Sequence, residues 1–180
     1  MAQLDPRSDE ALVEAANRGD EGAFEALYRR HRDWVVRLAF RFTGSEADAL
    51  DVLQDTFAYL LRKFPGLRLT SRLTTFLYPV VKHLAIRAAR KRRQHASGDQ
   101  ALSEAQAPDA PSQPREELAA VLRVLPEAQR EVLLMRFVDD MGLRQIAEAL
   151  DVPLGTVKSR LHNALKALRK DERTRAYFLE

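Results

Sequence analysis

The chain has 180 residues, 46% of them hydrophobic, and a formal net charge of +3 at pH 7. This apolar fraction supports packed cores and excludes a disordered protein, and the length allows one large domain or two small ones. Because there is no cysteine, we expect no disulfide and no thiolate zinc site. No apolar run approaches the ~20 residues needed to cross a membrane, and the N-terminus does not resemble a signal peptide, so we expect a cytoplasmic protein. We also expect no cofactor.

Helical periodicity runs through the first part of the chain. Ser8 predicts the start of a first helix, and apolar residues over 24–42 keep helical spacing up to Gly44, a predicted C-cap. Ser45 begins another helix, which Pro65-Gly66 closes. No stretch alternates with period two for long enough to predict a strand, so the expected class is all-α. The expected buried stripe of the helix after Ser45 is Leu50, Leu53, Phe57, Leu60, Leu61 and Phe64.

A third long helix follows and runs into a basic block at 82–93. Pro79 falls inside this helix, where it removes one backbone hydrogen bond, so we expect a kinked or shortened helix. The basic block contains no acid and predicts a nucleic-acid surface. The expected buried stripe is Leu73, Phe76, Leu77, Val80, Leu84 and Ala88.

An acidic block at 46–55 contains no base and suggests a basic protein partner, although a solvated face explains it equally well. Asp48, Asp51 and Asp55 share one helical face and could in principle hold a divalent metal. No histidine lies near them, and no second acidic helix offers further ligands. We therefore expect neither a metal site nor an enzyme.

Residues 94–114 have the composition of a linker, with three prolines, several small or polar residues and three acids without a base. Helical periodicity resumes after them. We therefore expect two all-helical domains, 1–93 and 115–180, joined by a flexible linker at 94–114.

The second half predicts a helix-turn-helix. A short helix carries Leu118, Val121, Leu122 and Leu125, and Pro126 then fits the first turn of a helix with Val132, Leu133 and Phe137 on its stripe. The next helix carries Leu143, Ile146, Ala147 and Leu150, and Asp151-Val152-Pro153 ends it. Residues 153–168 are predicted to form the last helix, and we expect this helix to enter a DNA major groove. Its apolar stripe is Leu154, Val157, Leu161, Leu165 and Leu168.

Two sets of short motifs, in this order and on either side of the linker, resemble the extracytoplasmic-function (ECF) sigma factors, the small promoter-specificity subunits of bacterial RNA polymerase. The resemblance covers about residues 20–93 and 117–170. In the first domain the matching strings are Phe24-Glu25-Ala26-Leu27-Tyr28, Asp48-Ala49, Leu53-Gln54-Asp55-Thr56-Phe57, Thr75-Phe76-Leu77-Tyr78 and Leu84-Ala85. In the second they are Leu125-Pro126-Glu127, Gln129-Arg130-Glu131-Val132-Leu133, Ile146-Ala147-Glu148, Val152-Pro153 and Gly155-Thr156-Val157-Lys158-Ser159-Arg160-Leu161.

The resemblance implies a role for each surface of the first domain. The helix with Asp48, Asp51, Gln54 and Asp55 is similar to the region that docks on the clamp helices of the largest polymerase subunit. An acidic face with an amide suits a basic helical partner. The 68–93 segment is similar to the part that recognises and opens the −10 element, which needs cations and a face for unstacked bases. The residues implied there are Phe76, Tyr78, Lys82, His83, Arg87, Arg90, Lys91 and Arg92, with core packing the alternative for Phe76.

For the −35 element, the resemblance implies contacts from the last helix and one earlier basic residue. Lys158 could donate to guanine and Asn163 could read adenine. The implied −35 residues are Arg136, Thr156, Lys158, Ser159, Arg160, His162 and Asn163.

Three positions of the first domain depart from the family, which usually has Trp at the position of Phe76, Arg at that of Pro79 and Asn at that of His83. A −10 preference therefore cannot be carried over from the family.

The implied partners are core RNA polymerase, through its clamp helices and the flap of the second-largest subunit, promoter DNA and an anti-sigma factor. We expect no membrane insertion. The main alternative is a stand-alone helix-turn-helix regulator that dimerises through its N-terminal domain and binds palindromic sites. That alternative leaves the acidic block and the basic run without a role.

Overall fold

The computed structural model describes residues 5–96, 120–171 and 174. All regular structure within these ranges is helical, which confirms the all-α prediction. Contacts between Cα atoms divide the chain into two compact units, Met1–Ala101 and Leu102–Glu180. Most of the predicted linker, 97–114, lies outside the described residues. No helix of the described part is long and apolar enough to span a membrane.

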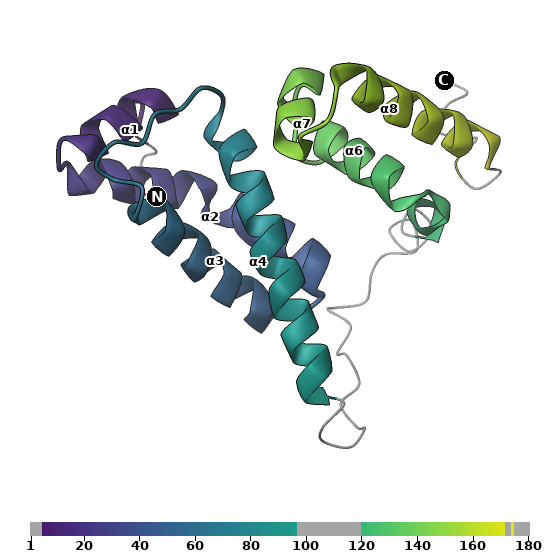
Figure 1. Cartoon of the computed structure of the whole chain (residues 1–180), viewed down its shortest axis with the longest axis horizontal. Coiled ribbons are helices and arrows are strands. Elements are labelled where there is room, and N and C mark those ends of the chain that lie inside the picture. The colour runs from purple at the N-terminus through teal and green to yellow at the C-terminus, as the bar shows by residue number, and fades with distance from the viewer. Residues whose placement is uncertain (1–4, 97–119, 172–173, 175–180) are drawn as a thin grey trace. The chain divides into compact units, whose positions relative to one another are not determined.

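The first unit consists of α1 (Asp9–Asn17), α2 (Glu21–Thr43), α3 (Glu46–Leu61) and α4 (Leu73–Ala96), with α2 in contact with each of the other three and α3 also against α4 (Figure 1). Ser8 and Ser45 cap α1 and α3 through their side-chain oxygens, and Asp20 caps α2 in the same way. Gly44 ends α2 in the left-handed conformation that glycine adopts without a Cβ penalty. The predicted starts at Ser8 and Ser45 and the predicted end at Gly44 are confirmed.

Apolar side chains from all four helices form the core of this unit. The ring of Phe57 on α3 meets Phe24 and Tyr28 of α2 edge-on, at centroid distances of 6.3 and 4.8 Å. Such edge-to-face pairs add to the stabilisation from burial alone. The largest fully buried residues of the unit are Leu12, Leu27, Val35, Leu38, Val52, Leu60, Leu73, Leu77 and Tyr78.

The buried face of α4 differs from the predicted stripe by one position. Leu73 and Leu77 are buried as predicted, but the helix then buries Val81, Ala85 and Ala89. Phe76, Val80, Leu84 and Ala88 are only partly buried. Positions 77, 81 and 85 share a face because they lie four residues apart, and that face is the one that meets α2 and α3.

Pro79 does not end or shorten α4. The helix continues from Leu73 past this residue to Ala96, beyond the predicted domain boundary at residue 93. Pro79 has no N–H to donate and is exposed, while its neighbours Tyr78 and Val81 are fully buried in the core. The prediction of a shortened helix was therefore wrong.

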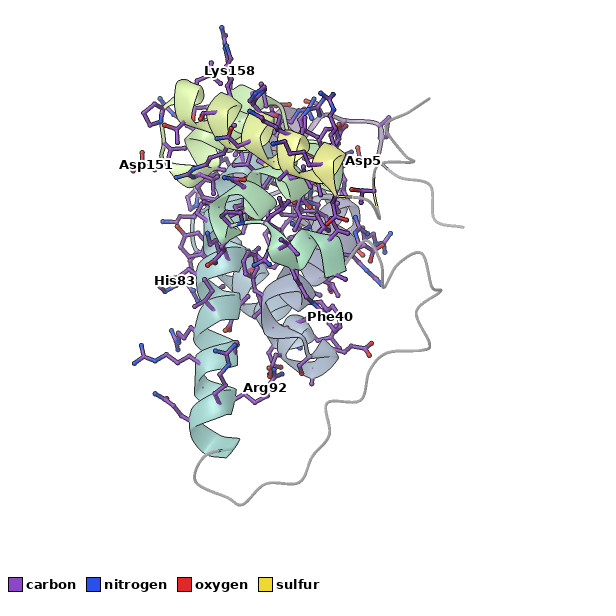
Figure 2. All side chains as sticks on the ribbon, turned by 90° about the vertical axis from the view of Figure 1, so that its right-hand side faces the viewer. Asp5, Phe40, His83, Arg92, Asp151 and Lys158 are labelled. Carbon is purple, nitrogen blue, oxygen red and sulfur yellow. The ribbon has the colours of Figure 1, made fainter. Side chains whose placement is uncertain are left out.

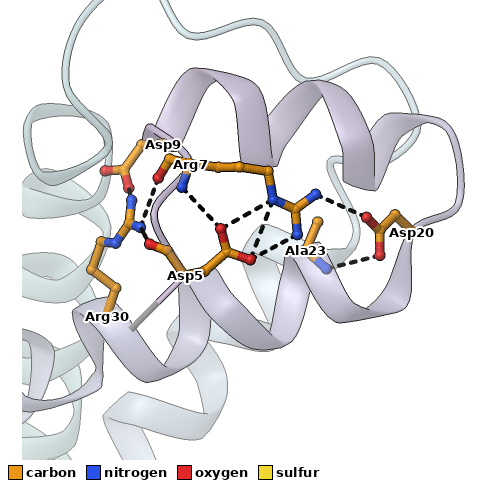
Figure 3. Close-up of polar contacts among 6 residues, drawn as sticks. All are labelled: Asp5, Arg7, Asp9, Asp20, Ala23 and Arg30. Carbon is orange, nitrogen blue, oxygen red and sulfur yellow. Dashed lines mark hydrogen bonds and ion pairs between the residues drawn. The ribbon is translucent and has the colours of Figure 1, made fainter. Parts of the chain in front are cut away.

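Charged groups fasten the N-terminal segment and α1 onto α2 (Figure 3). Arg30 donates to Asp9 at 2.6 Å and to the backbone oxygens of Asp5 and Arg7, each at 2.7 Å. The guanidinium of Arg7 pairs with Asp5 at 2.8 Å and with the cap residue Asp20 at 3.0 Å. Hydrogen bonds from Arg7 lower the pKa of Asp5 to about 2 and lower the pKa of Asp20 as well.

The carboxylate of Asp9 is the most enclosed member of this group. Its second oxygen lies 2.8 Å from Nε2 of the buried His31. Burial acts to raise the pKa of Asp9, but hydrogen bonds and charge from His31 and Arg30 outweigh it and lower the pKa. The folded unit therefore stabilises the ionised form of the Asp9 carboxylate.

The second unit consists of a helix whose described part is residues 120–124, followed by α6 (Glu127–Phe137), α7 (Leu143–Leu150) and α8 (Leu154–Lys170) (Figure 1). Val132, Leu133 and Ile146 are buried as predicted, whereas Phe137 is exposed at the end of α6. One apolar cluster joins Val121 and Leu125 to Leu133, Ala164 and Leu168, with Leu161 and Leu165 packed against it.

The connection from α7 to α8 is the tight turn that a helix-turn-helix requires. Asp151 adopts the left-handed conformation at φ 52° and ends α7, and Pro153 directly precedes α8. At the other end of α7, the side chain of Gln145 accepts a hydrogen bond from the Gly142 N–H at 2.8 Å. The predicted break at 151–153 is therefore confirmed.

Candidate nucleic-acid and protein interfaces

The outer face of α8 carries donors and acceptors that suit base edges. Val157 and Ala164 are fully buried and fix the opposite side of the helix. Figure 2 shows Lys158 pointing away from the ribbon. Of the residues expected on this face, Thr156 and Arg160 are half-buried, and the exposed ones are Lys158, Ser159, His162 and Asn163. Ammonium, hydroxyl, imidazole and amide groups together can donate to guanine and read adenine.

Arg136, expected to act with α8, lies in the last turn of α6. Its guanidinium is 3.5 Å from the carboxylate of Asp140 and lies 5.8 Å from the centroid of the Phe137 ring. The carboxylate offsets part of the charge of Arg136, and contact with DNA phosphates would compete with this exposed pair.

The outer face of α4 presents cations. His83, Arg87, Arg90 and Lys91 are all exposed, and positions 83, 87 and 90 share one face because of their i, i+4, i+7 spacing. Lys82 is half-buried, with its ammonium 5.9 Å from the centroid of the Phe42 ring. A row of exposed cations along a helix matches the charge that a phosphate backbone requires.

The two aromatic residues expected to receive bases have different environments. Tyr78 is fully buried on the core side of α4, so its ring cannot serve as a stacking face, which corrects the expectation. Phe76 is half-buried and stacks on Tyr59 of α3 with a centroid distance of 6.3 Å. The ammonium of Lys63 lies 4.7 Å from the centroid of the Tyr59 ring. The sequence did not single out Tyr59, because the contact joins two helices.

The expected protein-docking residues line α3. Asp51, Gln54 and Asp55 are exposed, whereas Asp48 is half-buried. Leu50 and Leu61, which the sequence predicts as core, are 45% and 55% exposed. Both lie on the face of Gln54, four residues before it and seven after it, and this spacing could have indicated them. Exposed leucines among acids make α3 a mixed apolar and acidic surface.

Asp48 already has a partner from the basic run. Arg92 on α4 donates to its carboxylate at 2.5 Å and to the backbone oxygen of Thr43 at 2.5 Å. The acidic and basic blocks, which the sequence assigns to separate partners, therefore touch. Within the described residues, no group of three or more acids, histidines or cysteines is placed to hold a metal ion.

Comparisons with known proteins identify the family to which the chain belongs. Residues 27–95 match the family "Sigma-70 region 2", and residues 115–168 match "Sigma-70, region 4". The chain therefore belongs to the sigma-70 family of RNA polymerase sigma factors, in its ECF group. It is 25% identical to the ECF RNA polymerase sigma factor SigW of Bacillus subtilis, over 89% of this chain and 95% of that protein. It is 29% identical to the sigma-H factor of Pseudomonas aeruginosa, over 93% and 95%, and to the ECF sigma-E factor of Escherichia coli K12, over 89% and 92%.

Solved structures share the fold. CnrH, in a complex with the cytosolic domain of CnrY, matches with a TM-score of 0.67 at 22% identity, covering 89% of this chain and 94% of that one. The sigma factor RpoE, in a complex with the anti-sigma factor NepR from Bartonella quintana, matches with a TM-score of 0.62 at 22% identity, covering 82% and 94%. Both likenesses establish a fold in common with this chain.

Proposed function

We propose that this chain directs RNA polymerase to two-element promoters through three surfaces, on α3, α4 and α8. The observation that supports this most strongly is that regions 2 and 4 of the sigma-70 family match in order, one to each compact unit. The first predicted domain, residues 1–93, would bind core polymerase and open DNA at the −10 element. The second predicted domain, residues 115–180, would hold the −35 element.

The polymerase surface is the exposed face of α3. Asp51, Gln54 and Asp55 offer charge and hydrogen bonds, and Leu50 and Leu61 add apolar area that the clamp helices of the polymerase can cover. Charges at such an interface steer association, whereas buried apolar anchors supply most of the affinity. Asp48 belongs to the same surface, but its carboxylate already accepts a hydrogen bond from Arg92.

The two DNA surfaces differ in what they read. On α8, Lys158, Ser159, His162 and Asn163 would contact the −35 element together with Arg136 of α6, and Thr156 and Arg160 would lie near phosphates. On α4, His83 stands where it can contact an unpaired base, next to the exposed cations. The cations that would hold the −10 phosphates are Lys82, Arg87, Arg90 and Lys91.

Partners other than polymerase and DNA follow from the family. RpoE and NepR form a sigma and anti-sigma complex, and we infer that an anti-sigma factor also covers surfaces of this chain. The chain would work in the bacterial cytoplasm, where polymerase transcribes. It would position polymerase and DNA without an active site of its own, so we do not class it as an enzyme.

Reconstituted transcription tests the proposal. Core polymerase with and without the purified chain is supplied with genomic DNA fragments, and the 5′ ends of the transcripts are mapped. We expect new start sites that share two upstream elements and depend on the chain. A chain that neither binds core nor creates start sites, and instead forms dimers on palindromic DNA, would contradict the proposal and support the stand-alone regulator.

A further inference from the structure

Arg92 joins the three long helices of the first unit at one point. Its guanidinium donates to the backbone oxygen of Thr43, the last residue of α2, and to the carboxylate of Asp48 in the first turn of α3. A helix C-terminus favours a nearby cation, and a helix N-terminus favours a carboxylate. Thr43 and Ser45 exchange hydrogen bonds at the same corner, so the acceptors are held in place.

The direction of Arg92 sets it apart from its neighbours in the basic run. Positions 85, 89 and 92 follow one another at i, i+4 and i+7, so Arg92 continues the face that buries Ala85 and Ala89. Figure 2 labels Arg92 where α4 meets the ends of α2 and α3. Arg92 is exposed, as Arg87, Arg90 and Lys91 are, but its guanidinium is engaged by Asp48 and by the backbone of Thr43. The acidic block thus holds this cation of the basic run.

We propose that Arg92 couples polymerase binding to DNA binding by exchanging partners. In the free protein it is paired with Asp48. When a basic group of the polymerase takes the carboxylate of Asp48, Arg92 is released to a DNA phosphate. This inference rests on the proposed function, because it requires that α3 binds polymerase and that α4 binds DNA.

The energetics permit such an exchange. The side chains of Arg92 and Asp48 are 45% and 21% exposed, and partly exposed ion pairs are weak enough for a competing charge to displace them. Once the polymerase has displaced Arg92 from Asp48, a DNA phosphate can bind Arg92 without having to break this ion pair. The same holds for the polymerase at Asp48 when DNA has bound Arg92 first. Thermodynamic linkage requires the coupling to be reciprocal, so DNA bound to Arg92 must also favour polymerase at Asp48.

The first test measures DNA binding by the free protein. Asp48→Asn removes the charged partner of Arg92 and leaves only the Thr43 backbone oxygen, so we expect the variant to bind a labelled single-stranded oligonucleotide of mixed sequence about two- to fivefold more tightly. The slope of log affinity against log salt should steepen by about 0.7, the value for one additional phosphate contact on a single strand. Fluorescence anisotropy at several salt concentrations gives both quantities.

Two variants show whether Arg92 is responsible. Glu46→Gln removes an exposed charge from the same end of α3 and should leave the salt slope unchanged. In Asp48→Asn combined with Arg92→Gln, the gain in affinity and slope should disappear. A gain that persists without Arg92, or an Asp48→Asn variant that binds DNA no more tightly than wild type, overturns the proposal.

The reciprocal test measures binding to core polymerase. Arg92→Gln uncovers Asp48 and should tighten core binding about two- to fivefold, whereas Arg37→Gln, an exposed cation of α2, should not. Combined with Asp48→Asn, Arg92→Gln should give no gain over Asp48→Asn alone. Unchanged or weaker core binding by Arg92→Gln overturns the exchange while wild-type binding and transcription still support the proposed function. A wild-type chain that does not bind core contradicts both.

Discussion

The two basic helices, α4 and α8, are anchored by different means and carry different chemistry on their outer faces. α8 is fixed by apolar side chains, Val157, Ala164 and Leu168, and presents amide, hydroxyl and imidazole groups between two exposed lysines, Lys158 and Lys166. α4 is fixed by apolar residues and also by the charge of Arg92, and its outer face is mainly cationic. Mixed donors and acceptors distinguish base pairs, whereas cations bind any sequence. Under the proposed function, we therefore expect sequence reading chiefly from the second unit and phosphate binding chiefly from the first.

The largest effect should come from removing the apolar anchor of α8. Val157→Asp places a carboxylate at a fully buried position, and we expect it to lower the free energy of unfolding of the second unit by about 3 kcal/mol or more. Ala167→Asp, on the exposed side of the same helix, should cost only about 1 kcal/mol, from lower helix propensity and a carboxylate near the helix C-terminus. Thermal unfolding followed by circular dichroism measures both. Equal effects would show that α8 is not held by this stripe.

The charged fastening of the first unit should depend on pH. Because the pKa of Asp9 is lowered in the folded state, its contribution to stability is complete above the unfolded value of about 3.9 and is lost as the pH falls through the folded pKa. Asp9→Asn should cost about 1–3 kcal/mol at pH 7, and the difference from wild type should shrink below pH 4. Denaturant unfolding from pH 7 to pH 3 checks this. A difference that stays constant with pH would exclude an ionised Asp9 as the cause.

A base contact should act at one promoter position. Lys158→Ala is expected to reduce discrimination at a single −35 base pair by about 1–3 kcal/mol and to leave the other positions as they are. Affinity of the holoenzyme for promoters with each base changed in turn gives the measurement. A uniform loss across all sequences would instead identify Lys158 as a phosphate contact.

The smallest effect should come from a phosphate contact. Arg90→Ala should weaken binding to all duplex promoters to a similar degree and reduce the salt slope by about 0.9. Titrations at several salt concentrations measure the slope. Altered preference for one base would contradict the division between α4 and α8.

The sequence predicted the helix-turn-helix well because α8 has one apolar stripe, so its periodicity allows one buried face. α4 has two overlapping stripes, one through Phe76 and Val80 and one through Leu77 and Val81. Periodicity cannot choose between them, and the choice depends on the face that α2 and α3 cover. For α3, the spacing of Leu50 and Leu61 from Gln54 does place them on its exposed face, and the core assignment rested on their apolar character alone.

The contact between Arg92 and Asp48 could not be predicted, since it joins residues 44 positions apart through the packing of three helices. The sequence shows the acidic and basic blocks, but it does not show that they contact each other. Likewise the caps at Ser8 and Ser45 are local and were predicted, whereas the burial of Tyr78 depends on the neighbouring helices.

The most direct test of a division between base reading and phosphate binding compares Lys158→Ala with Arg90→Ala on one set of promoters. Holoenzyme affinity is measured for every single base change in both elements, with each variant and with wild type. The account predicts that Lys158→Ala loses discrimination at one −35 position and that Arg90→Ala keeps the wild-type pattern at lower affinity. The same pattern of loss for both variants would contradict it.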